Sequence, residues 1–135
     1  MAVYLDSSAL VKLVVHEPES EALRSYVRRH GTRVSCALAR VEVVRAVRPQ
    51  GRRAIASARE LLKRLHLMRL DDALLDTAAD LGHAAVRSLD AIHLGAAQTL
   101  GGELEALVTY DIRMKEAASQ LGLIDVRAPG GRQQS

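Results

Sequence analysis

The chain has 135 residues, of which 48% are hydrophobic and 26% charged, and its formal net charge is +3. One folded domain is expected at this length, and the ordinary apolar fraction excludes wholesale disorder. Lys12, Glu17 and later charges interrupt every apolar run, so no segment is predicted to cross a bilayer, and Asp6 interrupts the stretch that would otherwise suit a signal peptide.

A strand pattern and a helix pattern alternate along the first half of the chain. A short buried strand is predicted over residues 2–6, and a helix follows it through Val15, with Ser7 and Ser8 offering N-cap oxygens. A second helix is predicted to begin at Pro18 and to end at Gly31. The other elements predicted here are a strand over 33–36, a helix over 38–47 that Pro49 and Gly51 break, a helix over 52–65 and a strand over 67–70.

The second half continues the alternation and completes an α/β pattern. Helices are predicted from Asp71 or Asp72 to Leu81, over 90–100 and over 112–121, and strands over 107–109 and 124–126. The alternation predicts a single α/β domain over 1–127, with a central, mostly parallel five-stranded sheet flanked by helices. Residues 128–135 (APGGRQQS) are predicted to form a disordered tail.

The numbers of cysteine, aromatic and basic residues indicate the cellular compartment of the protein and the kinds of ligand it can bind. Cys36 is the only cysteine, which excludes an intramolecular disulfide and a cysteine-based zinc site and favours a reducing cytoplasm. With no Phe, no Trp and three Tyr, recognition of nucleic-acid bases by stacked aromatic pairs is not expected. Sixteen of the nineteen basic residues are arginine, whose planar fork suits phosphates and carboxylates.

Four acidic residues interrupt apolar sequence. Asp6 ends the first strand, Glu42 lies among three valines, Asp90 begins an otherwise apolar helix, and Asp111 follows the strand over 107–109. A charge in apolar surroundings is costly unless it is paired or bound to a metal, and ligand sites of parallel sheets form at the carboxyl ends of strands. If the strands are placed correctly, the carboxylates converge there, and their repulsion favours a hard divalent cation such as Mg²⁺.

Each acid also has an ordinary structural explanation. Asp6 would suit a turn into the first helix, but Ser7 and Ser8 already offer caps, which favours a functional Asp6. Four such acids in one chain favour a shared site. The explanations for the other three are a contact with the helix dipole for Asp90, an ion pair with Arg45 for Glu42, and a helix cap for Asp111.

Three neighbouring polar residues are less informative. His93 follows Asp90 by three residues on one helical face, and a hydrogen-bonded, partly buried histidine is the expected interpretation, with a residue that orients a ligand as the alternative. Ser8 is expected to cap the helix, with a contact to a carboxylate as the alternative. Thr109 is either an ordinary strand residue or a site hydroxyl.

Residues 45–69 form a basic segment in which eight Arg and Lys face only Glu60. Arg52, Arg59 and Lys63 share one stripe of the predicted helix. The segment is either a solvated outer face or a surface for phosphates or an acidic partner, and its density and one-sidedness favour the second.

Five segments together resemble a known family. They are VYLDSSALVKL at 3–13, SCALARVEVVRA at 35–46, SLDAIHLGAA at 88–97, VTYDIRMKEAA at 108–118 and LGLIDVRAP at 121–129. In this order and spacing they are similar to PIN-domain proteins, specifically VapC-type toxins of bacterial toxin–antitoxin pairs. Gly95 is a departure, because the family often has alanine there.

The resemblance implies a cytoplasmic endoribonuclease dependent on Mg²⁺ or Mn²⁺. It implies Asp6, Asp90 and Asp111 as metal ligands, Glu42 as a ligand through water or the group that orients the attacking water, and Ser8 and Thr109 as supporting hydroxyls. One or two ions remain possible, and hydrolysis by water would leave a 5′-phosphate. The implied partners are RNA, a VapB-type antitoxin and a second copy of the chain, without a membrane. Residues expected to bind RNA or antitoxin are Arg45, Arg48, Arg52, Arg59 and Lys63.

Two other functions remain open. One is an RNA-processing PIN nuclease without a toxin role, and the other is a non-catalytic module that binds an antitoxin or nucleic acid. Metal-dependent cleavage separates the nucleases from the binding module, and a small partner gene immediately upstream separates the toxin from the processing enzyme.

Overall fold

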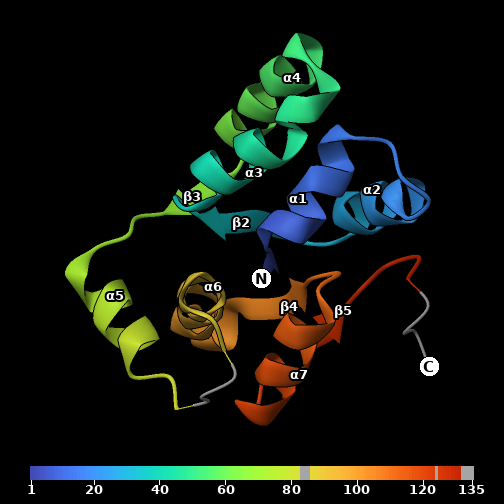
Figure 1. Cartoon of the computed structure of the whole chain (residues 1–135). Coiled ribbons are helices and arrows are strands. Elements are labelled where there is room, and N and C mark those ends of the chain that lie inside the picture. Colours follow the sequence, from blue (N-terminus) through green and yellow to red (C-terminus); the bar gives the residue numbers. More distant parts are fainter. Residues whose placement is uncertain (83–85, 124, 132–135) are drawn as a thin grey trace.

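A five-stranded parallel sheet forms the centre of the computed structural model, which describes residues 1–82, 86–123 and 125–131 (Figure 1). The strand order is β3-β2-β1-β4-β5, and all four strand pairs are parallel, which confirms the predicted fold class. The strands are β1 (Ala2–Leu5), β2 (Thr32–Cys36), β3 (His66–Met68), β4 (Leu104–Val108) and β5 (Val126–Arg127). The start of the fifth predicted strand, Ile124, lies outside the described residues.

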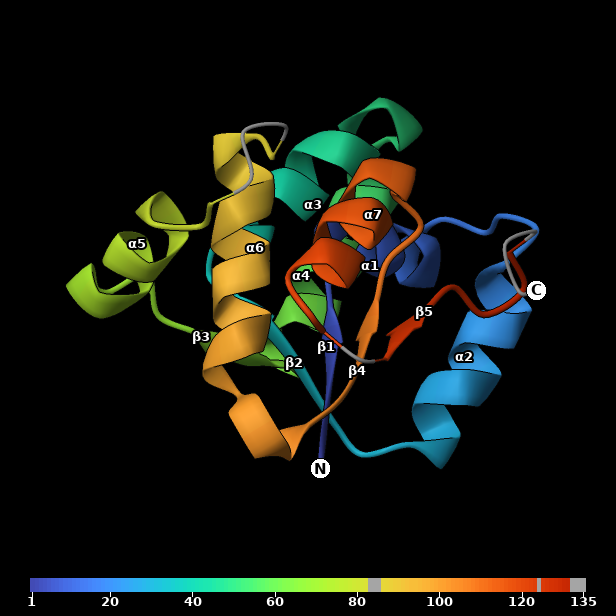
Figure 2. The ribbon, with the colours of Figure 1, turned by 90° about the horizontal axis from the view of Figure 1, so that it is seen from below.

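Among the described residues, seven α-helices cover the two faces of this sheet (Figures 1 and 2). Helices α1 to α4 lie on one face, and α5 to α7 lie on the other. No helix in the described part of the chain is both long and apolar enough to span a bilayer. The helices are α1 (Ser7–Val14), α2 (Ser20–Arg29), α3 (Ala39–Val47), α4 (Arg52–Lys63), α5 (Asp72–Ala79), α6 (Ser88–Thr99) and α7 (Ile112–Gln120).

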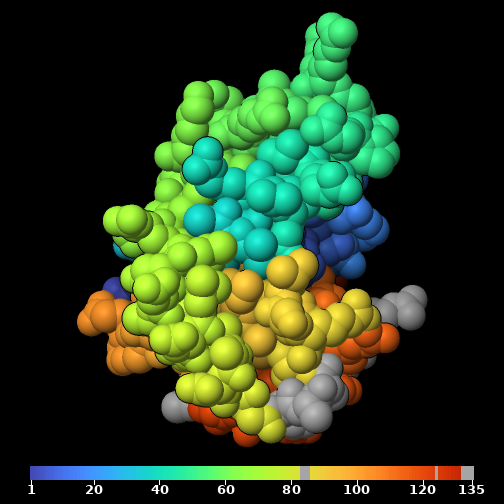
Figure 3. Space-filling model, turned by 60° about the vertical axis from the view of Figure 1, so that its left-hand side comes forward, coloured from blue at the N-terminus to red at the C-terminus, as the bar shows by residue number. Residues whose placement is uncertain are grey.

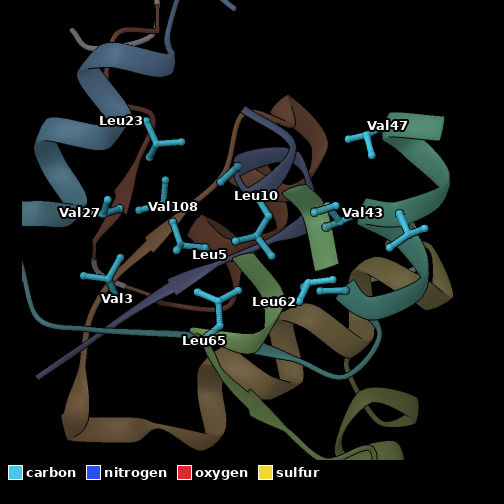
Figure 4. Packing of buried hydrophobic residues seen from close by; sticks show 14 residues of the cluster. Val3, Leu5, Leu10, Leu23, Val27, Val43, Val47, Leu62, Leu65 and Val108 are labelled. Atoms are coloured by element: carbon cyan, nitrogen blue, oxygen red, sulfur yellow. The ribbon is translucent and has the colours of Figure 1, made fainter. Parts of the chain in front are cut away.

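The residues of β1 alternate between two apolar cores, as the pleat of a central strand requires. Val3 and Leu5 pack with α1 to α4, whereas Ala2 and Tyr4 pack with α5 to α7. Figure 4 shows the first core, where Leu5 and Leu10 lie between the sheet and the surrounding helices. Each of these fully buried leucines stabilises the fold by roughly 1.5–3 kcal/mol, which holds the end of β1 in place.

The structure corrects the predicted start of the first helix. Asp6, not Ser7 or Ser8, is the N-cap of α1, and its Oδ1 accepts a hydrogen bond of 3.0 Å from the backbone N–H of Ala9. Asp6 therefore has a structural role that the sequence argument had given to the serines. An aspartate carboxylate at the N-cap reaches the backbone donors of the first turn as well as a serine hydroxyl does. Residue type alone therefore does not distinguish Asp6 from the two serines as the cap.

Two further boundaries have local causes. The break between the third and fourth helices is a 3₁₀ turn, Arg48–Gln50, followed by Gly51 at a φ of 103°, which glycine adopts without a Cβ clash. In the region expected to be a disordered tail, the carbonyl of Pro129 accepts a hydrogen bond of 2.7 Å from the Tyr110 hydroxyl. Residues 132–135 lie outside the described residues.

Candidate active site

The four predicted acids lie at or near the N-termini of α1, α3, α6 and α7, at the carboxyl edge of the sheet. Asp6 caps α1 and Asp111 caps α7, while Glu42 and Asp90 lie in the first turns of α3 and α6. Strands β1 and β4 are neighbours with Leu5 opposite Val108, so the segments that carry Asp6 and Asp111 leave the sheet side by side. The positive ends of the helix dipoles favour carboxylates at all four positions.

Asp6 is the most enclosed of the four acids, with 2% of its surface exposed. Its Oδ1 accepts a hydrogen bond of 2.6 Å from the Ser8 hydroxyl, and its Oδ2 accepts one of 2.5 Å from the Thr109 hydroxyl. Burial raises the pKa of Asp6, while the charge of His93 and these hydrogen bonds oppose that rise.

The two hydroxyls in turn accept backbone hydrogen bonds. The N–H of Tyr110 donates to Ser8 Oγ at 3.0 Å, and the N–H of Asp111 donates to Thr109 Oγ1 at 3.1 Å. Ser8 and Thr109 therefore join the end of β1 to the end of β4 through Asp6. For Ser8 this is the carboxylate contact that the sequence analysis had placed second to helix capping.

Asp90 is the acid whose charge is least well compensated. Burial raises its pKa, the charges of Asp111 and Asp6 raise it further, and the charges of His93 and Arg87 lower it. The repulsion links Asp90 on α6 with two aspartates on other elements, the N-cap residues of α1 and α7. Asp111 also caps α7, because its Oδ1 accepts a hydrogen bond of 2.9 Å from the N–H of Arg113, as one of the structural explanations had predicted.

The partner of Glu42 is a histidine, whereas an ion pair with Arg45 had been one of its ordinary structural explanations. His93 Nε2 lies 2.7 Å from Glu42 Oε1, and the Ser7 hydroxyl donates to the same oxygen at 2.5 Å. Burial would raise the pKa of Glu42, but these hydrogen bonds and the charge of His93 lower it. The partners of Glu42 therefore come from α6 and α1, across the edge of the sheet.

His93 is buried and hydrogen-bonded, as expected, and it lies at the centre of a polar network. Its Nδ1 is 2.8 Å from the hydroxyl of Tyr4, a fully buried residue of the central strand β1. Burial alone would lower the pKa of His93, but its contacts with Cys36 and Glu42 raise that pKa to about 10. The spacing of Asp90 and His93 on one helix was the sequence signal for this network, whereas nothing in the sequence pointed to Tyr4.

Within the described ranges of the chain, the carboxylates at this edge have the chemistry of ligands for a divalent cation but are not grouped as a metal site. In the part of the chain that the structure describes, no three His, Cys, Asp or Glu side chains are grouped closely enough to hold a metal ion. The chemistry of the donors does fit a hard cation, because Asp6, Asp90 and Asp111 offer carboxylate oxygens and two of these charges raise the pKa of the third. The residues therefore suit a cation without forming a closed metal site on their own.

The predicted basic residues lie on α3, on α4 and in the turn between them, away from the sheet (Figures 1 and 3). All five are exposed. Arg59 and Lys63 border a groove of about 690 Å³ whose walls include the apolar side chains of Val44 and Leu62. Arg40 lines the same groove and was not among the predicted residues, because it precedes the basic segment in the sequence.

Comparisons with known proteins agree with this architecture. The family model of the PIN domain matches residues 3–120. Ribonuclease VapC46 of Mycobacterium tuberculosis is 53% identical over 122 residues, which cover 90% of this chain and 94% of that protein. Ribonuclease VapC35 of the same species is 45% identical over 132 residues, which cover 95% of this chain and 97% of that protein.

Two solved structures share the fold at low sequence identity. The sarcin–ricin-loop-cleaving toxin VapC20 of M. tuberculosis has a TM-score of 0.71 and 14% identity, over 85% of this chain and 94% of the toxin. A chain of a toxin–antitoxin complex from Klebsiella pneumoniae has a TM-score of 0.70 and 16% identity, over 94% of this chain and 97% of that one.

Proposed function

This chain belongs to the PIN-domain family and, within it, to the VapC ribonucleases, and from that premise we propose that it is an endoribonuclease toxin that requires a divalent cation and is neutralised by an antitoxin. The observation that carries the proposal is the placement of four carboxylates at the starts of four helices along one sheet edge. Mg²⁺ is the first choice of cation and Mn²⁺ the second, and we place the activity in the cytoplasm.

The aspartates and Glu42 take different roles in this proposal. Asp6, Asp90 and Asp111 hold the cation, which when bound supplies positive charge for the scissile phosphate and makes water more acidic. Ser8 and Thr109 keep Asp6 fixed through their hydrogen bonds to its two oxygens.

Glu42, whose carboxylate accepts hydrogen bonds from His93 and Ser7, orients the attacking water and accepts its proton. Attack by water breaks the bond to the 3′ oxygen and leaves a 5′-phosphate and a 3′-hydroxyl.

Cleavage of a mixed RNA pool tests the activity. Antitoxin-free protein is incubated with Mg²⁺, with Mn²⁺ or with EDTA, beside the folded variants Asp90→Asn and Asp76→Asn. Asp76 is an exposed acid of α5 and serves as the matched control. We expect metal-dependent cuts with 5′-phosphates from the wild type and from D76N, and none from D90N. Cyclic phosphate ends, or equal cutting by D90N, would contradict the proposed chemistry.

The basic surface of α3 and α4 takes the RNA backbone in this proposal, and an acidic segment of the antitoxin when RNA is absent. Exchanging Arg59 and Lys63 for Glu should weaken RNA binding and flatten its dependence on salt. With fewer phosphate contacts, binding releases fewer counterions from the RNA. The control is the double change of Arg28 and Arg29 to Glu, which reverses two exposed charges on α2. Equal salt slopes for the two double variants would exclude this surface.

Assembly completes the proposal. The chain is expected to form a homodimer and, with its antitoxin, a larger hetero-oligomer. Sedimentation of the purified chain alone and with the product of an adjacent small gene measures both states. A monomer at all concentrations, or no complex with that product, would remove the corresponding part of the proposal.

A further inference from the structure

A chain of buried and half-buried polar side chains connects the two helical layers at the carboxyl edge of the sheet. It runs from Tyr4 on β1 through His93 on α6 to Glu42 on α3, and Ser7 on α1 closes it. Tyr4 is fully buried and His93 is 2% exposed. Because α3 and α6 cover opposite faces of the sheet, the contact between His93 and Glu42 bridges the two layers beside the proposed site.

The donors and acceptors of this chain determine how the imidazole is held. A carboxylate only accepts hydrogen bonds, so the His93 Nε2 at 2.7 Å carries the proton that Glu42 Oε1 accepts. The Tyr4 hydroxyl, 2.8 Å from Nδ1, either donates or accepts, and it therefore satisfies the other ring nitrogen in either protonation state. The two rings meet edge to face at 74°, and the imidazole of His93 is buried between its partners.

Glu42 depends on this contact more than the other acids depend on any one partner. Asp6 and Asp111 accept hydrogen bonds from the backbone of the helices that they cap. Glu42, in the first turn of α3, is held by side chains, from His93 and Ser7. Since a glutamate side chain has three rotatable bonds, removing His93 would leave one hydroxyl to restrain its carboxylate.

We propose that His93 is a positioning residue for RNA cleavage: its Nε2–H holds the Glu42 carboxylate in one orientation, and Tyr4 fixes the imidazole. The inference rests on the proposed function for its catalytic consequence, but the hydrogen bond itself does not. If a residue acts only through Glu42, its removal lowers kcat and leaves substrate binding intact. Its removal has no further effect in a variant that already lacks the Glu42 carboxylate.

A double-mutant cycle tests this dependence. The wild type first selects, from a mixed RNA pool, an oligoribonucleotide that it cuts, and kcat and KM are then measured for His93→Leu, Glu42→Gln and the double variant. We expect H93L to lower kcat on the order of 100-fold with KM unchanged within about threefold. The double variant should equal E42Q within the same margin. Losses that multiply, or a normal kcat in H93L, would overturn the inference.

A conservative replacement separates positioning from a purely structural role. His93→Gln places an amide N–H where Nε2 lies, so H93Q should recover most of the kcat that H93L loses. His66→Gln, at an exposed histidine of β3, is the control for the exchange itself. If H93L does not fold, Tyr4→Phe takes its place in the cycle, with a smaller loss of kcat that is again absent when E42Q is present.

NMR of the imidazole nitrogens gives a readout that needs no RNA. In the wild type, Nε2 of His93 should be protonated and hydrogen-bonded, and E42Q should shift its signal. A wild-type protein that cuts no RNA overturns the proposed function alone. A His93 signal that E42Q leaves unchanged overturns this inference, whatever the activity.

Discussion

Thr109 holds the side chain of Asp6 in place by a direct hydrogen bond from the end of β4. Its hydroxyl donates to the buried Asp6 carboxylate at 2.5 Å and accepts from the N–H of Asp111 at 3.1 Å. Thr109→Val keeps the shape of the side chain and removes both hydrogen bonds, so the change leaves no cavity. The Oδ2 of Asp6 and the backbone N–H of Asp111 then lack the hydroxyl as a hydrogen-bond partner.

The cost follows from the two bonds. A hydrogen bond to a charged group contributes about 1.5–3 kcal/mol and one between neutral groups about 0.5–1.5 kcal/mol, so T109V should lower the free energy of unfolding by roughly 2–4 kcal/mol. With an unfolding entropy of about 2.1 cal/mol/K for each of the 135 residues, that loss lowers Tm by roughly 7–14 °C. Because the lost bond favours the ionised carboxylate, the pKa of Asp6 should rise further.

Thr109→Ser is the matched control, since it keeps the hydroxyl and loses one buried methyl group at a cost of about 1 kcal/mol. Unfolding in guanidinium chloride measures stability, and cleavage of RNA with Mg²⁺ measures the site. T109V should be the less stable of the two and should lose cleavage, whereas T109S should keep both nearly intact. If T109V unfolds at the same midpoint as T109S, the hydroxyl does not hold Asp6 as argued.

Three other outcomes are expected. Asp90→Asn should raise Tm, because it removes a charge whose pKa is raised by burial and by the charge of Asp111; a lower Tm would show that Asp90 is not strained by its neighbours. The pKa of His93 is raised from 6.5 to about 10 in the folded state, so its stabilising contribution is complete below pH 6.5 and is lost as pH rises toward 10. The free energy of unfolding should therefore fall as pH rises between these values, and His93→Gln should remove that component from denaturation curves at pH 7, 8 and 9. Gly95→Ala should stabilise the protein by roughly 0.5–1 kcal/mol in thermal melts, because a Cβ there lies 3.5 Å from the backbone of Ala78, an ordinary contact, and alanine favours the helix; a loss of stability would mean that α5 and α6 need the glycine.

The order of the elements and the parallel sheet could be predicted because strand and helix periods alternate and because Gly31, Gly51 and Gly101 mark helix boundaries. The convergence of Asp6 and Asp111 also follows from the sequence, once β1 and β4 are neighbours. The cap of α1 was assigned to the serines because several residues beside one another can all accept from the first turn, and only the backbone shows which of them does.

The partner of Glu42 could not be predicted for a different reason. Within α3 the sequence offers Arg45 three residues away, a spacing that favours a pair, whereas His93 lies 51 positions along the chain and on the opposite face of the sheet. The spacing of residues within one helix does not predict a contact between helices on opposite faces of the sheet. The same holds for Tyr4, whose position in an apolar strand gives no sign that its hydroxyl meets an imidazole.

The four carboxylates of the candidate site differ in how well neighbouring groups stabilise their negative charge. Asp6 and Asp111 accept backbone hydrogen bonds as helix caps, and Glu42 has His93, so these three carboxylates have partners within the protein. Asp90 lies in a favourable first turn, yet the charges of Asp111 and Asp6 still raise its pKa. A cation at this edge would reverse the sign of that interaction, so the least compensated acid is the one that gains most from binding. The fold thus tolerates a local loss of stability at the position where the proposed function needs charge.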